Sequence, residues 1–162
     1  MKRELIWDTQ VVIRRIRVNY NRMLLQELDI LEALGGKKII FINPEVLFSF
    51  PLEAKGEQEV EVVFFHLIGH KATQEEINAQ REALGLVEDA FAQLAVNEAD
   101  LGFADKYDNA ITWKDDNGRS CYLSMLNDPE TCEQYIFMGY KPNNHWFGTS
   151  FGGWWFAGAR KA

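Results

Sequence analysis

Two histidines four residues apart, His66 and His70, have a spacing that could support metal chemistry. On a helix this spacing places two imidazole rings on one face, where they can share a zinc ion. The surrounding sequence VVFFHLIG is typical of a strand, in which the two rings would lie ~13 Å apart at about 3.3 Å per residue. We therefore expect no shared metal ion. His70 is the better candidate for a titrating functional group, because it follows Gly69 and precedes a helix start.

The acidic segment 115–118, Asp-Asp-Asn-Gly, invites comparison with a calcium-binding loop. In that pattern the first and last acidic ligands would fall on Trp113 and Ser124. Neither residue has a carboxylate, so the loop lacks the calcium ligands required at both ends. Asn117-Gly118 is instead the residue pair that a two-residue hairpin turn of type I′ requires. We therefore predict a turn here and no metal site.

The segment 35–38, Gly-Gly-Lys-Lys, joins an expected helix to an expected strand. A phosphate loop runs in the opposite order, from strand to helix, so a helix end with two nearby cations is the natural interpretation. The sequence contains no Cys-x-x-Cys motif. We predict no cofactor, and whether the chain is an enzyme stays open.

Aromatic residues and glycines are concentrated in the segment from His145 to Gly158. This segment contains three of the five tryptophans. In an extended strand, alternate residues point to opposite faces, so two rows of rings result. One row can fill the core, whereas the other either packs inside the subunit, forms a homodimer interface or lines a small-molecule pocket. With neighbouring strands and His70 included, the candidate ligand-binding or interface residues are His70, Trp113, Tyr122, His145, Trp146, Phe151, Trp154 and Trp155.

Two main helices are expected to position these residues. Apolar residues recur every three or four positions from Asp8 to Leu34, which indicates a helix. As one helix it would be ~40 Å long at about 1.5 Å per residue, so we expect a break near residues 19–21. The β-branched run Val11 to Ile13 also allows a strand there. The second helix begins at the capping box of residues 73–76 and runs to about Asn97.

Strands are predicted at 38–42, 60–68, 110–114, 120–126, 133–140 and 145–158, with a short helix after Pro44 and a loop over 100–109. The later strands follow one another as a meander, so the last should pair with its predecessor. We therefore predict a single α+β domain over residues 1–162. Its antiparallel sheet would have five to six strands, with two main helices packed on one face.

The composition restricts the possible partners. Of 162 residues, 47% are hydrophobic and 25% charged, which is typical of a globular domain with its own core. The net charge of −7 disfavours nucleic acid and anionic membrane surfaces as partners. The N-terminus lacks a signal-peptide pattern, so we expect a cytoplasmic protein. Cys121 and Cys132 are expected to be buried free thiols, too far apart for a disulfide.

Three functions remain open from the sequence. The main expectation is a non-catalytic binding or interaction module, homodimeric through its aromatic C-terminal strand. The alternative is a small-ligand-binding or catalytic domain that takes an apolar or aromatic ligand in an aromatic-lined pocket, with a histidine as the titrating group. The acidic charge also allows a protein that binds a basic partner.

Overall fold

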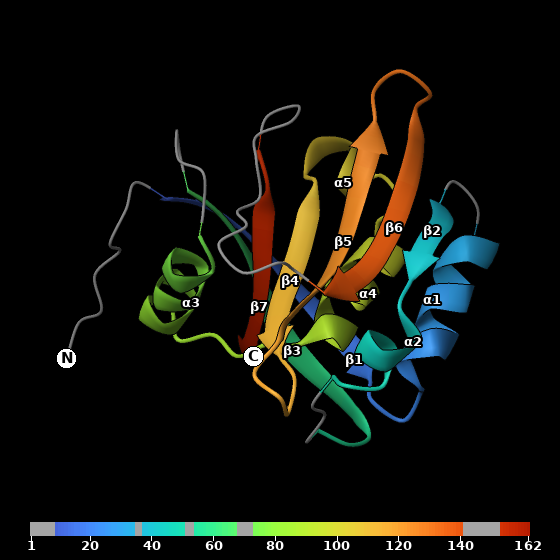
Figure 1. The fold of residues 1–162 in the computed structure, drawn as a ribbon. Coiled ribbons are helices and arrows are strands. Elements are labelled where there is room, and N and C mark those ends of the chain that lie inside the picture. The colour runs from blue at the N-terminus through green and yellow to red at the C-terminus, as the bar shows by residue number, and fades with distance from the viewer. Residues whose placement is uncertain (1–8, 35–36, 51–53, 68–72, 141–152) are drawn as a thin grey trace.

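The computed structural model describes residues 9–34, 37–50, 54–67, 73–140 and 153–162. Within these ranges the chain forms a seven-stranded sheet in the order β1-β3-β7-β4-β5-β6-β2 (Figure 1). Its strands are β1 (Thr9–Asn19), β2 (Lys37–Ile42), β3 (Glu57–Leu67), β4 (Asn109–Lys114), β5 (Ser120–Asp128), β6 (Glu133–Tyr140) and β7 (Trp155–Lys161). β1 and β2 are therefore the two edge strands of the described sheet.

The sheet is mixed, so the expected antiparallel sheet of five to six strands is wrong. β2 runs parallel to β6 and β7 runs parallel to β4, while the other neighbouring strands are antiparallel. Turn signals in a sequence identify only strands joined by hairpins. β2 and β7 reach their parallel neighbours through long connections, so no turn signal indicates these pairings. The combination of helices with a largely antiparallel sheet is nevertheless α+β.

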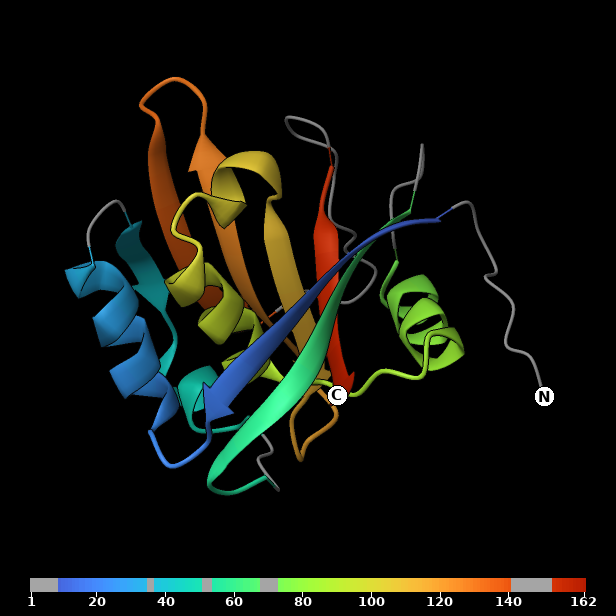
Figure 2. The ribbon, with the colours of Figure 1, turned by 180° about the vertical axis from the view of Figure 1, so that it is seen from behind.

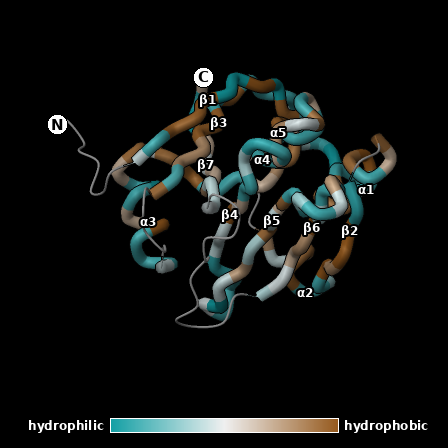
Figure 3. The backbone as a smooth tube through the Cα atoms, turned by 90° about the horizontal axis from the view of Figure 1, so that it is seen from above, coloured by the Kyte–Doolittle hydropathy of each residue, from teal (hydrophilic) through white to brown (hydrophobic). Residues whose placement is uncertain are grey.

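Helices cover both faces of the sheet, which corrects the expected pair of helices on one face. The described helices are α1 (Leu24–Ala33), α2 (Pro44–Leu47), α3 (Gln74–Ala83), α4 (Ala90–Ala99) and α5 (Phe103–Lys106). α1, α2, α4 and α5 contribute to the larger core, whereas α3 packs over β3 and β7 on the opposite face (Figures 2 and 3). Among the described residues, no helix is long and apolar enough to span a bilayer.

Residues 9–19 form a strand where a helix was the main expectation. Ile13 and Ile16 are three residues apart and would share a helical face, but in β1 they point to opposite faces. Ile16 packs against the larger core, whereas the Ile13 side chain is 45% exposed. The β-branched residues of this segment favour the strand. The expected helix after residues 19–21 is confirmed as α1.

The long helix expected over 73–97 is divided into α3 and α4. The capping box at Thr73 is confirmed, but α3 ends at Ala83 and Gly85 has a φ of +72°, which stops a right-handed helix. α4 then begins after Asp89, whose side chain accepts a hydrogen bond from the Ala92 amide. The two helices consequently cover opposite faces of the sheet, so the apolar positions of this segment belong to two different cores.

The C-terminal strand β7 lies inside the sheet, between β3 and β4, and not beside β6 as expected. Val63 lies opposite Gly158, and Asn109 lies opposite Trp155. Gly158 also faces the segment after α3, because a Cβ atom on it would lie 2.7 Å from the Leu86 Cβ. The absence of a side chain at Gly158 therefore allows this segment to approach β7.

The hairpin between β4 and β5 is confirmed, with a turn of a different type from the one predicted. Asp115 and Arg119 close the turn through a backbone hydrogen bond of 3.0 Å, and Gly118 alone within it has a positive φ. Asp115 Oδ1 accepts hydrogen bonds from the amides of Asn117 and Arg119. This carboxylate thus stabilises the turn.

Replacing Gly158 with alanine tests the placement of β7. The added methyl group would overlap Leu86, so we expect Gly158→Ala to lower the free energy of unfolding by about 1–3 kcal/mol. Urea denaturation followed by tryptophan fluorescence measures this change. Gly102→Ala is the matched control, because the nearest atom to its new Cβ would be an ordinary 3.6 Å away. Equal stabilities of the two variants would contradict the close packing.

Candidate functional site

The outer edge of β1 carries backbone groups that point away from the sheet. Asn19 lies opposite Glu57, so the next pair in the register is Tyr20 and Gly56, and the Tyr20 amide donates to the Gly56 carbonyl at 2.8 Å. In an antiparallel ladder, pairs that exchange hydrogen bonds alternate with pairs that do not. The even residues of β1 therefore bond to β3. The amides and carbonyls of four odd residues, Val11, Ile13, Arg15 and Arg17, point to the outer edge.

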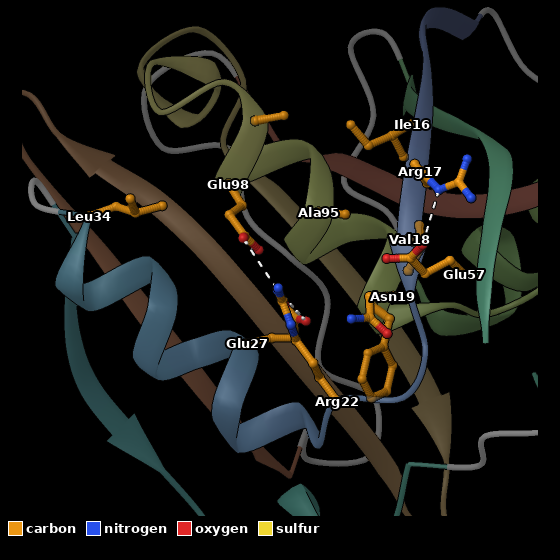
Figure 4. A pocket seen from close by; sticks show the side chains of 12 residues that line it. Ile16, Arg17, Val18, Asn19, Arg22, Glu27, Leu34, Glu57, Ala95 and Glu98 are labelled. Carbon is orange, nitrogen blue, oxygen red and sulfur yellow. Dashed lines mark hydrogen bonds and ion pairs between the residues drawn. The ribbon is translucent and has the colours of Figure 1, made fainter. Parts of the chain in front are cut away.

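A groove of about 370 Å³ lies beside the C-terminal half of β1 (Figure 4). Four consecutive residues of β1, numbers 16–19, line it. Because consecutive side chains point to opposite faces, a cavity lined by all four runs along the edge of the strand. The opposite wall comes from α1 and α4, including Leu34 just after α1 and Ala95 of α4. The groove thus lies between an edge strand and two helices.

A carboxyl pair with an arginine lies on the helical side of this groove. Arg22 Nη1 is 3.3 Å from Glu27 Oε1 and 3.6 Å from Glu98 Oε1. Figure 4 shows Arg22 between these two carboxylates, one from α1 and one from α4. Burial, followed by the Glu98 carboxyl, raises the pKa of Glu27 to about 7, although Arg22 acts in the opposite direction. Glu27 therefore changes its charge close to neutral pH.

A second cavity, of about 430 Å³, is lined by Tyr20 and Asp89 among other residues. The Tyr20 hydroxyl donates a 2.5 Å hydrogen bond to Asp89 Oδ2. Burial raises the pKa of Asp89, while the bond from Tyr20 acts to lower it. The remaining lining combines apolar groups with charges of both signs: Phe50, Ala54, Gln58, Val60, Val87, Glu88, Ala159, Arg160 and Lys161. Its size and aromatic lining are typical of a small-ligand site.

The residues predicted as a site do not form one surface. Trp113 is 1% exposed and packs against Phe50 in the larger core, with its indole nitrogen donating to Ser49 Oγ at 3.3 Å. Tyr122 is half-buried on the adjacent strand, and its ring lies near Gly139 and Phe41. Trp113 lies opposite Cys121 in the β4–β5 ladder, so these two side chains point to the same face. Tyr122 follows Cys121 in β5 and therefore points to the other face.

Trp154 and Trp155 are half-buried and contact residues of the same chain. The Trp155 ring stacks on His66 at 5.3 Å between centroids, and the Trp154 carbonyl lies 3.0 Å from His66 Nδ1. One edge of β7 pairs with β3, and the other pairs with β4 at Trp155 and Phe156 and with Val87 at Ala159, so a dimer would use a face of this strand. The predicted site residues His70, His145, Trp146 and Phe151 lie outside the described residues.

Two features of the chain were not predicted from the sequence. Glu27 lies on the same helical face as Leu24 and Leu31, so a buried carboxyl could have been suspected from its position. Residues 148–152 read Gly-Thr-Ser-Phe-Gly, which fits the Gly-x-Ser-x-Gly pattern of a nucleophile elbow. That motif requires a helix after the serine, whereas the chain enters strand β7 at Trp155. The segment itself lies outside the described residues.

The two cysteines are both free, but Cys132 is exposed and not buried as expected. Among the residues that the structure describes, no three His, Cys, Asp or Glu side chains converge to hold a metal ion. Comparisons with protein family models, curated proteins and solved structures returned no match. The functional proposals therefore depend on the groove, the second cavity and the edge of β1.

Replacing Glu27 with glutamine tests the carboxyl pair through pH. The folded-state pKa of Glu27, about 7, is above its ordinary value of 4.5, so its contribution to stability is complete below about pH 4.5 and is lost as the pH rises through 7. Between pH 5 and 8 the wild type should lose up to about 3 kcal/mol relative to Glu27→Gln. Urea denaturation across this range measures the difference. Asp29→Asn, at an exposed position of α1, should keep the wild-type pH dependence.

Proposed function

We propose that the chain is a non-catalytic binding module that takes an extended peptide segment as an added strand on the outer edge of β1. The observation that carries this proposal is the outward direction of the amides and carbonyls of Val11, Ile13, Arg15 and Arg17. None of these backbone groups bonds to another described strand, and the Ile13 carbonyl accepts from the exposed Arg14 side chain of β1 itself, at 3.1 Å. A row of such groups is a template for strand addition.

The length and surroundings of β1 support this edge over β2. β1 has eleven residues, whereas β2 has six and an irregular register between Ile39 and Phe41. The side chains of Val11 and Ile13 are 43% and 45% exposed and offer apolar contacts to an added strand. The 370 Å³ groove beside β1 offers room for side chains that point toward α1 and α4.

The proposal retains the interaction class expected from the sequence and assigns it to a different strand. A strand can bind another chain along its edge only where its backbone groups are unpaired. β7 lies between two neighbours, whereas β1 has one. The homodimer through the aromatic C-terminal segment stays a prediction, because His145, Trp146 and Phe151 lie outside the described residues.

A proline at position 13 should block the proposed binding without breaking the sheet. The Ile13 amide points outward, so Ile13→Pro removes a donor from the edge and none from the β1–β3 ladder. A fluorescent peptide with the sequence of residues 57–65, EQEVEVVFF, serves as the probe in anisotropy titrations. We expect the wild type to bind it and Ile13→Pro to lose at least about tenfold in affinity, since several backbone hydrogen bonds are affected.

Ile13→Thr is the matched control, because it removes a similar apolar side chain but keeps the amide. We expect Ile13→Thr to bind within about threefold of the wild type, as is usual for one exposed contact. Circular dichroism and thermal melting confirm that both variants are folded. Amide exchange of residues 9–19 locates the peptide. Equal binding by Ile13→Pro and Ile13→Thr would overturn the proposal.

A second candidate function is the binding of a small aromatic ligand in the cavity beside Tyr20. It is favoured by the 430 Å³ volume and by the rings of Tyr20 and Phe50 at its wall. Glu88 and Asp89 could interact with a cationic ligand, and Lys161 could interact with an anionic one. This candidate corresponds to the pocket alternative from the sequence, with a buried carboxyl in place of a histidine.

Tryptophan fluorescence can test this cavity, because Trp113 contacts Phe50 at 5.1 Å between ring centroids. Titration with benzylamine and with benzoate should change the emission for the ligand whose charge fits. Val87→Trp is expected to narrow the opening, since Val87 is 65% exposed at the rim, and to weaken binding several-fold. The added indole requires a difference spectrum against the free variant. No response to either compound at millimolar concentration would contradict a site for such ligands.

A further inference from the structure

We infer that the segment added to β1 is acidic where it faces Arg15 and Arg17 and apolar where it faces Val11 and Ile13. This inference rests on the proposed function and specifies the chemistry of its partner. It commits to an extended segment of another polypeptide. The grounds are the charge of β1, the spatial order of its side chains and the strand that already pairs with its inner edge.

The charge of β1 is unusual for this chain. Residues 9–19 contain three arginines and no aspartate or glutamate, whereas the whole chain has a net charge of −7. Arg17 is 3.4 Å from Glu57, and both side chains are largely exposed. Within the described residues, Arg14 and Arg15 have no carboxylate at ion-pair distance. The outer edge therefore has positive charge that a partner can neutralise.

The inner neighbour β3 shows what sequence complements β1. In the β1–β3 register, Glu59 lies opposite Arg17 and Glu61 opposite Arg15. Val63 lies opposite Ile13, and Phe65 lies opposite Val11. Side chains on one face of a sheet interact with those directly opposite on both neighbouring strands. An added antiparallel strand with two alternate acids followed by two alternate apolar residues would thus repeat the pattern of β3.

The core-facing side of the added strand has its own requirement. Residues opposite Ile16 would point toward the groove, whose lining combines the apolar Leu34 and Ala95 with the charged Arg22, Glu27 and Glu98. An apolar side chain directly opposite Ile16 would pack against Ile16 itself. Arg14, on the same face, lies over the Phe103 ring at 5.5 Å and donates to the Ile13 carbonyl at 3.1 Å. The added strand would therefore have acids opposite Arg17 and Arg15 and an apolar residue between them, opposite Ile16. Apolar residues would follow toward Val11, as in β3.

A second copy of β1 is a poor occupant of this edge. Pairing two copies would place three arginines beside three arginines with no acid between them. Like charges on adjacent strands repel each other and destabilise the pair. Edge arginines thereby disfavour self-association and still permit an acidic strand. Charge complementarity thus selects a different segment over a homodimer through β1.

Three nine-residue peptides test the inference on the full chain. The first has the sequence EQEVEVVFF, the second replaces the two glutamates corresponding to Glu59 and Glu61 with glutamine, and the third replaces them with lysine. We expect affinity to fall by about tenfold from the first peptide to the second, because two exposed ion pairs are lost, and further for the third. The difference between the first two should shrink in 0.5 M salt.

A charge reversal on the protein provides the complementary test. Arg15→Glu should weaken binding of the glutamate peptide and strengthen binding of the lysine peptide. Lys114→Glu, an identical charge change at an exposed residue of β4, should leave the order of the three peptides unchanged. Thermal melting establishes that both variants are folded, and amide exchange establishes that the peptides occupy residues 9–19.

The outcomes separate the inference from the proposed function. If the peptides protect the β1 amides but glutamate and glutamine versions bind equally, strand addition holds and the acidic specificity is overturned. If the lysine peptide binds most tightly to the wild type, the acidic specificity is also overturned. If no peptide protects β1, and Ile13→Pro behaves as the wild type, the proposed function itself fails.

Discussion

Backbone hydrogen bonding within the sheet is the constraint on which the rest of the structure depends. β7 supplies hydrogen bonds to β3 on one side and to β4 on the other, and so joins the β1–β3 pair to the β4–β5–β6 meander. Every strand from β3 to β6 in the sheet order therefore has a neighbour on each side, although β7 and β4 pair through only two residues each. The two outermost strands have one neighbour each, and the longer of these is β1. The proposed binding edge is thus a consequence of where β7 inserts.

Local signals in the sequence predicted many elements and failed where long-range pairing decides. The capping box at Thr73 and the helix start after Asn43 are confirmed, because each depends on a few adjacent residues. Residues 9–19 contain apolar spacings compatible with either a helix or a strand. Their eleven cross-strand pairs with β3 decide for the strand. No local pattern records that pairing, and Gly85 alone was too weak a signal to divide α3 from α4.

The candidate site was less predictable than the fold. The status of an edge strand depends on the order of all strands, and two of the pairings in that order are parallel. Arg22 and Glu27 are close in sequence, but Glu98 comes from α4, so only the folded chain brings the second carboxyl to this pair. The aromatic residues near the C-terminus were conspicuous in the sequence. Those that the structure describes are engaged mainly with rings of the same chain, as Trp155 is with His66 and Tyr107.

Phe91 lines the groove and contacts two rings that line the second cavity. Its ring centroid lies 5.9 Å from that of Tyr20 and 6.2 Å from that of Phe50. An occupant of the groove that displaced this ring would act directly on the rings of Tyr20 and Phe50. Occupants of the groove and of the cavity would then be thermodynamically linked, and each would alter the affinity of the other by the same factor. A single phenylalanine thereby gives two separate compartments the means for heterotropic cooperativity.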